Sequence, residues 1–85
     1  MAINILLAAV EPGNEQHVIN TLNNISHTEV TAQGEGYIII ATDNEKSEDD
    51  FNLMETIRSI EEVKHLSLVI SANDDALNAL NIKDF

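Results

Sequence analysis

Three histidines and several adjacent acidic pairs are the residues of this sequence whose chemistry could serve catalysis or metal binding. His17, His27 and His65 are predicted to lie on a helix, in a loop and on a strand, which is not the spacing of metal ligands. Adjacent acids such as Asp49 and Asp50 point in different directions on a helix and are typical of a solvated face. No nucleophile stands with a base and an orienting group. We therefore predict that the chain is not an enzyme and uses no metal or cofactor.

The segment Gly34-Glu35-Gly36 is the one glycine-rich motif that could be compared with a phosphate-binding loop. It joins two predicted strands, does not lead into a helix and contains no lysine, so it does not fit that motif. Glycine takes the positive φ that other residues resist, and this favours a tight turn. The motif therefore predicts a β-hairpin between residues 28–33 and 37–42.

Composition limits the other possibilities. The 85 residues suffice for one domain with a small core. The chain has no cysteine, hence no disulfide and no thiolate chemistry. It has no apolar run of membrane-spanning length and no basic start typical of a secretory signal. We expect a cytoplasmic protein that does not insert into the membrane.

The charge balance is strongly acidic, with 15 acidic and 4 basic residues and a formal net charge of −11. Such a surface repels nucleic acid and anionic membranes, so we expect no nucleic-acid partner. It favours a basic partner. The alternative is that the acidity only keeps a small domain in solution.

The remaining elements follow from hydrophobic periodicity. Residues 3–10 form an almost continuous apolar run, as in an interior strand. Asn14 is predicted to cap a first helix, whose buried stripe is Val18, Ile19, Leu22 and Ile25. Ser47 is predicted to cap a second helix that buries Phe51, Met54, Ile57 and Ile60 or Val63. Residues 63–71 then form the last strand.

The order β-α-β-β-α-β predicts a ferredoxin-like α+β sandwich over residues 1–71. Right-handed crossovers place the four antiparallel strands in the order 4-1-3-2, with both helices on one face. Residues 72–85 are predicted to form a C-terminal tail that could include a short amphipathic helix, or else a frayed end.

Two helices leave one face of the sheet open. Alternation predicts that Ile5, Leu7, Ala9, Val30, Ala32, Leu66, Leu68 and Ile70 lie on the buried face. The third strand is apolar on both faces, so its pattern fits either placement. An apolar open face with polar margins is typical of an interaction surface. Its predicted peptide-binding residues are Leu6, Ala8, Thr31, Ile39, His65, Ser67 and Val69.

Ile5-Leu-Leu-Ala-Ala, the stripe Val18, Leu22 and Ile25, Glu29-Val and Gly36-Tyr-Ile-Ile-Ile resemble the first half of NapD-type proteins. Met54-Glu-Thr-Ile-Arg-Ser-Ile-Glu-Glu-Val-Lys-His-Leu-Ser-Leu-Val-Ile is similar to that family's closing helix and strand. The resemblance covers residues 3–71. Ser26-His27 stands where the family usually has Pro-Gly.

The resemblance implies a small cytoplasmic ferredoxin-like chaperone. It implies that the partner is the twin-arginine signal peptide of the catalytic subunit of a periplasmic nitrate reductase, a molybdoenzyme precursor, and that export waits until the cofactor is loaded. The apolar face would bind the hydrophobic stretch of the peptide, and the acidic margin would attract its arginine pair. The peptide would bind as a helix on the face or as an added edge strand.

The alternative function is a regulatory or oligomerising domain of the same fold that binds a small ligand at a homodimer interface. The open face would then be covered by a second copy. A further hypothesis is that the tail itself packs on the open face and competes with the peptide.

Overall fold

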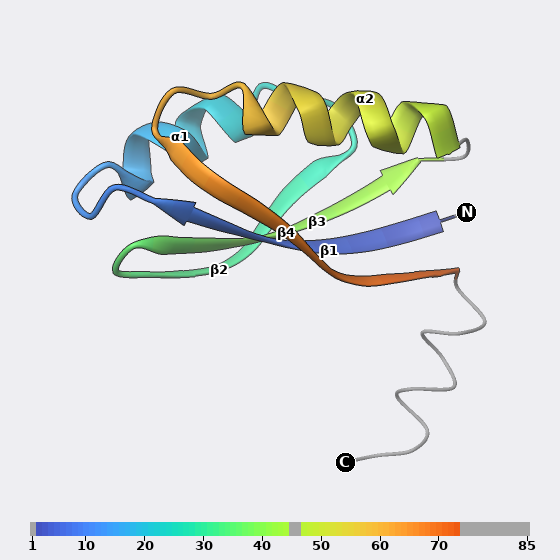
Figure 1. Ribbon diagram of the computed structural model, residues 1–85, viewed down its shortest axis with the longest axis horizontal. Helices are drawn as coiled ribbons and strands as arrows, with labels where there is room; N and C mark the ends of the chain where they lie inside the picture. Colours follow the sequence, from blue (N-terminus) through green and yellow to red (C-terminus); the bar gives the residue numbers. More distant parts are fainter. Residues whose placement is uncertain (1, 45–46, 74–85) are drawn as a thin grey trace, which may run out of the picture.

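The computed structural model describes residues 2–44 and 47–73, which form four strands and two helices (Figure 1). The elements in chain order are β1 (Ala2–Val10), α1 (Glu15–Leu22), β2 (Thr28–Gly34), β3 (Tyr37–Asn44), α2 (Ser47–Arg58) and β4 (Val63–Asn73). The strands and helices predicted within residues 1–71 are confirmed, with ends that differ by a few residues at most. Of the predicted tail, Ala72 and Asn73 belong to β4, and residues 74–85 lie outside the described residues.

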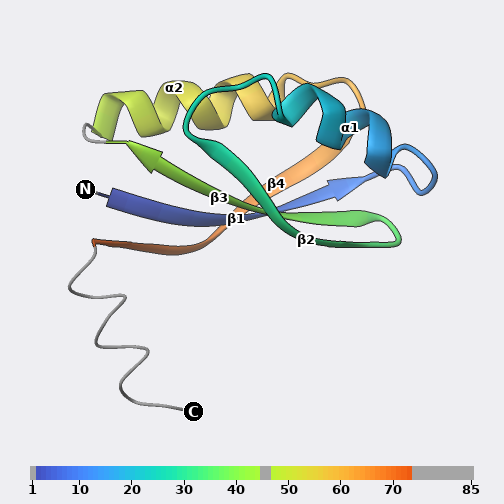
Figure 2. The ribbon, with the colours of Figure 1, turned by 180° about the vertical axis from the view of Figure 1, so that it is seen from behind.

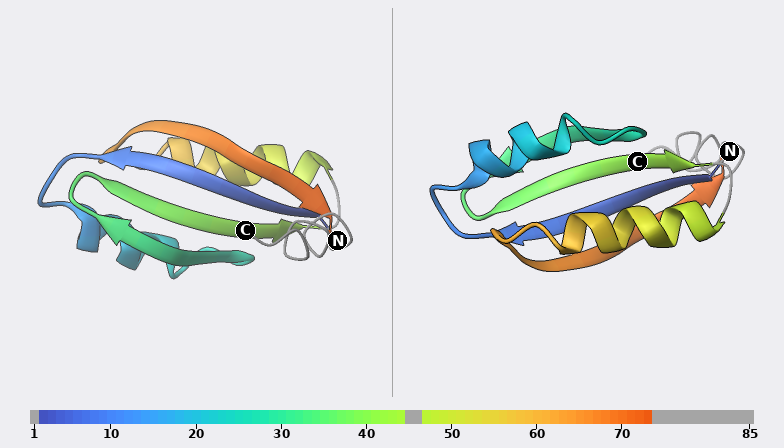
Figure 3. Two further views of the ribbon diagram at one scale, coloured as in Figure 1. Left: turned by 90° about the horizontal axis from the view of Figure 1, so that it is seen from below. Right: turned by 90° about the horizontal axis from the view of Figure 1, so that it is seen from above.

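One antiparallel sheet holds all four strands in the order β2-β3-β1-β4, which is the predicted order. Both helices lie on the same side of this sheet (Figures 1 and 2). Seen from above, the helices lie in front of the sheet, and seen from below they lie behind it (Figure 3). The ferredoxin-like fold is therefore confirmed, and no helix of the described residues covers the other face of the sheet.

The core lies between the sheet and the helices. Its fully buried side chains come from the two central strands and from both helices. The largest of them are Leu6, Val18, Leu22, Ile38, Ile40 and Ile57. Leu6 stands opposite Ile40, and Ala8 stands opposite Ile38, so both residue pairs point toward the helices.

The predicted alternation of β1 is wrong. Leu6 and Ala8 are 0% exposed and belong to the core, whereas Leu7 and its alternates Ile5 and Ala9 face away from the helices and are partly exposed. The physical reason is that β1 is apolar at almost every position, so its own pattern does not distinguish its two faces. The polar Asn4 is 3% exposed and shares the helix face, although its polarity favoured the other side.

β-bulges explain the other errors of face. Between Ile5 and Leu6 of β1, the partner in β4 changes from Ile70 to Leu68, so Val69 is an extra residue. Each bulge breaks the two-residue alternation and moves later side chains to the opposite face. Ile70 therefore lies on the open face, contrary to the prediction, and Leu68 stays on the helix side at an exposed edge.

A second bulge, in β2, has the same effect. Val30 pairs with Ile40, and the next pair is Ala32 with Ile39, so Thr31 is the extra residue. Val30 lies on the helix side, as predicted. Ala32 stands opposite Ile39 on the open face, so its predicted burial is wrong.

The first helix begins differently from the prediction. Asn14 precedes α1, but its side chain makes no capping hydrogen bond. The carboxylate of Glu15 instead accepts hydrogen bonds from the backbone N–H of Gly36 (2.6 Å) and of Gly13 (2.9 Å). The bond from Gly36 is the main cause that lowers the pKa of Glu15. Glu15 thus joins the β1–α1 loop to the turn between β2 and β3.

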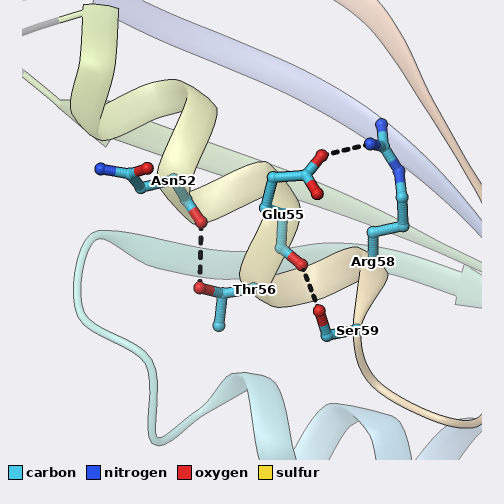
Figure 4. Close-up of polar contacts among 5 residues, drawn as sticks. All are labelled: Asn52, Glu55, Thr56, Arg58 and Ser59. Atoms are coloured by element: carbon cyan, nitrogen blue, oxygen red, sulfur yellow. Dashed lines mark hydrogen bonds and ion pairs between the residues drawn. The ribbon is translucent and has the colours of Figure 1, made fainter.

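The outer surface of α2 is polar (Figure 4). Arg58 forms an ion pair with Glu55, three residues earlier on the helix. The hydroxyl groups of Thr56 and Ser59 donate to backbone carbonyls one turn earlier. Phe51 is 64% exposed, so its predicted burial is wrong. Met54 packs against the core as predicted, and Leu53 packs there in place of Phe51.

Candidate functional site

The open face is the side of the sheet on which neither α1 nor α2 lies, and its centre is apolar. β1 contributes Ile5, Leu7 and Ala9, which stand opposite Ala41, Ile39 and Tyr37 of β3. All except Tyr37 are partly exposed, and Tyr37 is 42% exposed. Because β1 and β3 are the two central strands, these side chains form a continuous patch. Contiguous apolar patches of this kind mark interaction surfaces.

The predicted peptide-binding residues divide into three groups. Ile39 lies on the open face, and so do His65 and Ser67, which stand opposite Ala9 and Leu7. Thr31 and Val69 occupy bulges in the edge strands β2 and β4; both are exposed.

Leu6 and Ala8 cannot contact a ligand on the open face, because both are completely buried on the other side. Their predicted place in the binding site is therefore wrong, because the side chains of β1 alternate in the opposite sense to the prediction. Ile5, Leu7 and Ala9 lie on the open face in their place, although they were predicted to be in the core. The pairing of β1 with β3 shows which alternate residues of β1 face the helices, and the sequence of β1 alone does not.

Tyr37 extends the apolar patch over the turn. A Cβ atom added to Gly34 would lie 2.2 to 2.6 Å from atoms of the Tyr37 ring, so the ring lies directly across this glycine. Gly34 and Tyr37 are also paired in the ladder. The absence of a side chain at Gly34 therefore allows the aromatic ring to lie flat against the edge strand.

A hollow of about 400 Å³ lies at the opposite end of these strands, where β2 begins and β3 ends. Its lining is acidic, with an apolar wall. The lining residues are Ile3, His27, Thr28, Glu29, Ala41, Thr42 and Asp43. Glu29 stands opposite Ala41, and Asp43 stands opposite Ile3, so the hollow is continuous with the open face. The hollow could not be predicted from the sequence, because its lining residues come from three separate stretches of the chain.

His27 is fixed at the rim of this hollow. Its Nδ1 lies 3.4 Å from Oδ1 of Asp43, and its carbonyl accepts a hydrogen bond from the Asp43 N–H (3.1 Å). Its φ is +64°, a left-handed conformation that favours glycine. Ser26-His27 is the position where NapD-type proteins usually have Pro-Gly, so His27 stands where they have glycine.

The described residues give no further indication of a chemical site. Within residues 2–44 and 47–73, no group of three or more histidine, aspartate or glutamate side chains could hold a metal ion. Neither α1 nor α2 has the length and apolar character needed to cross a membrane.

The fold and the uncovered apolar face define a small ferredoxin-like domain. A family model described as "NapD protein" matches residues 1–75, and the chain therefore belongs to the NapD family. This confirms the resemblance found in the sequence.

The fold is also similar to a solved structure, the solution structure of the Escherichia coli Tat proofreading chaperone protein NapD. The TM-score is 0.77 and the sequence identity is 23%; the match covers 86% of this chain and 79% of the other. A search of curated proteins finds no significant match.

Proposed function

We propose that this chain is a small chaperone that binds a twin-arginine signal peptide in the cytoplasm. The client would be the precursor of a periplasmic nitrate reductase catalytic subunit, and binding would delay its export until the cofactor is loaded. The open apolar face is the observation that carries the proposal. Membership of the NapD family and the name of the similar E. coli protein support it.

The chemistry of a twin-arginine signal peptide matches this surface. Such a peptide combines a basic pair with an apolar stretch. Leu7 and Ile39 stand opposite each other at the centre of the open face and offer apolar contact. Glu29 and Asp43 offer carboxylates at one end of that face. The net charge of −11 would attract the basic peptide over a longer range.

The face is a better site for the peptide than either edge of the sheet. Addition of a strand requires a regular row of unpaired backbone groups. The edge strands β2 and β4 are both interrupted by bulges, at Thr31 and Val69. Bulges twist an edge away from a new strand and discourage pairing. A helical peptide lying on the face meets no such obstacle.

Substitution of Ile39 by glutamate tests this proposal. Ile39→Glu places a charge in the centre of the open face, and we expect it to weaken peptide binding by about tenfold or more, as for a central interface residue. Phe51→Glu is the matched control, because Phe51 is 64% exposed on α2, and α2 lies on the opposite side of the sheet from the open face (Figure 1). Fluorescence anisotropy with a synthetic twin-arginine signal peptide measures both affinities, and circular dichroism verifies that both variants fold. Equal affinity of Ile39→Glu and Phe51→Glu would refute the proposed face.

The electrostatic part of the proposal has a separate test. The association rate of the peptide should fall as ionic strength rises from about 20 mM to about 500 mM, since salt screens long-range attraction more than close contacts. Stopped-flow fluorescence measures this rate. A rate that does not change over that range would exclude attraction by the acidic surface.

A second copy of the chain is the alternative occupant of the open face. In that case light scattering would give twice the mass of one chain, and Ile39→Glu would restore the monomer. A dimer that does not bind the signal peptide at any tested concentration would favour this oligomerising alternative over the chaperone.

A further inference from the structure

The two ends of the open face differ in charge and in shape. One end has the hollow with Glu29 and Asp43. The other end has the exposed ring of Tyr37 and the imidazole of His65, both beside Ala9 on β1. The strands of the face therefore carry two carboxylates in a hollow at one end, and an aromatic ring and an imidazole at the other.

The lysine and arginine side chains of the described residues do not compensate the acidic end. Arg58 pairs with Glu55 on α2, which lies on the helix side of the sheet (Figure 4). Lys64 pairs with Glu11 beside the start of β4, at the end of the sheet that carries His65. Within residues 2–44 and 47–73, no lysine or arginine pairs with Glu29 or Asp43, and the imidazole of His27 lies 3.4 Å from Asp43.

We propose that this asymmetry fixes the direction in which a basic, apolar peptide lies on the face, an inference that rests on the proposed function. The arginine pair of the peptide occupies the hollow. The apolar stretch then runs along β1 and β3 toward Tyr37. The reverse orientation would place the guanidinium groups near His65 and Lys64, away from Glu29 and Asp43.

The lining of the hollow suits guanidinium groups in particular. Arginine presents a planar set of N–H donors that can bind a carboxylate through two parallel hydrogen bonds. Glu29 of β2 and Asp43 of the adjacent strand β3 each offer such a carboxylate to the hollow. Ile3 and Ala41 provide apolar walls for the methylene groups of the arginine stem.

The length of the face matches the proposed direction. Tyr37 and Asp43 are separated by six residues of β3, or about 20 Å at the rise of a strand. A helix with a rise of about 1.5 Å per residue spans this distance with about 13 residues. A short helical signal peptide can therefore place its basic end in the hollow and its apolar end against Tyr37.

Spin labels on the peptide test the direction. The chain contains no cysteine, so a nitroxide attached to a cysteine of a synthetic twin-arginine signal peptide stays on the peptide. With the label beside the arginine pair, we expect NMR line broadening of the amides of Glu29, Ala41 and Asp43. With the label at the far end of the apolar stretch, we expect broadening at Tyr37 and His65.

The possible results separate this inference from the proposed function. The reverse pattern, or equal broadening of both ends by each label, would overturn the single direction while leaving peptide binding in place. The absence of saturable binding and of any broadening would overturn both proposals.

Charge removal gives an independent test. The double variant Glu29→Gln and Asp43→Asn should lose about tenfold or more in peptide affinity, because two charge-assisted contacts disappear. The control removes the same charge from exposed positions of α2, with Glu48→Gln and Asp49→Asn. The two double variants have equal net charge, so an equal loss of affinity in both would show that the hollow does not bind the arginine pair.

Discussion

Leu6 and Leu7 are adjacent in β1 and face opposite sides of the sheet, which permits one substitution type to test both the core and the site. Leu6 is 0% exposed and stands opposite Ile40 in the core, whereas Leu7 stands opposite Ile39 on the open face. The same deletion, leucine to alanine, therefore removes core packing at one position and a surface contact at the next.

The two variants should differ clearly in stability. Truncation of a buried leucine to alanine costs about 2–5 kcal/mol, because it loses apolar burial and leaves a cavity. A domain of this size has a total stability of about 4–13 kcal/mol, so Leu6→Ala removes a large part of it. At about 4–8 °C per kcal/mol, a loss of about 3 kcal/mol lowers the Tm by about 12–24 °C. Leu7→Ala should cost about 1 kcal/mol, since Leu7 is already partly in contact with water.

Peptide binding should show the opposite order. Leu7→Ala should weaken binding by about five- to tenfold, as expected for a central interface side chain. Leu6→Ala should keep its affinity at temperatures where it is folded. Thermal melts followed by circular dichroism and titrations at 10 °C measure the two effects. If Leu7→Ala lowers the Tm as much as Leu6→Ala, or if Leu6→Ala alone loses the peptide, the assignment of the two faces is wrong.

Three further predictions concern Glu15, His27 and Gly34, which lie in or beside the loops and the turn that connect the strands and helices. Hydrogen bonds lower the pKa of Glu15 from its ordinary value of about 4.5, so its contribution to stability is complete above that value and is lost as the pH falls through the lowered pKa. Urea unfolding should thus show the difference between the wild type and Glu15→Gln shrinking below pH 4.5; a constant difference would contradict the role of the carboxylate. His27→Gly should raise the stability by up to about 1 kcal/mol, because relief of φ +64° outweighs an exposed contact with Asp43; a lower Tm would show that the contact dominates. Gly34→Ala should displace the Tyr37 ring, seen as shifted ring resonances in NMR, whereas unchanged resonances would mean that the ring does not lie on Gly34.

The order of the strands and helices could be predicted from the sequence because its signals are local. The turn at Gly34-Glu35-Gly36 marks a hairpin, and Gly36 indeed has φ +83°. The apolar stripe with Val18 and Leu22 marks α1, and both side chains are fully buried. Such patterns depend on neighbours in the chain, so one sequence suffices to read them.

The identity of the open face could not be predicted, because it depends on how strands pair. Residues 5–10 are all apolar, and either alternate set could have formed the core. Extra residues at Thr31 and Val69 then changed the face of Ala32 and Ile70, and neither bulge has a glycine or proline that would reveal it. Prediction of the fold therefore succeeded, whereas both β1 residues assigned to the site, Leu6 and Ala8, lie on the helix side of the sheet.

The position of the acidic groups explains more about the site than their number does. Salt screens charges over about 8 Å at physiological ionic strength, and the face is about 20 Å long between Tyr37 and Asp43. Acids on α2 therefore contribute to a general attraction, but they cannot decide which end of a bound peptide meets which end of the face. Glu29 and Asp43 can, because they lie within the face itself. A change in net charge on the helices should accordingly alter the association rate, and a change at the hollow should alter both the affinity and the direction of binding.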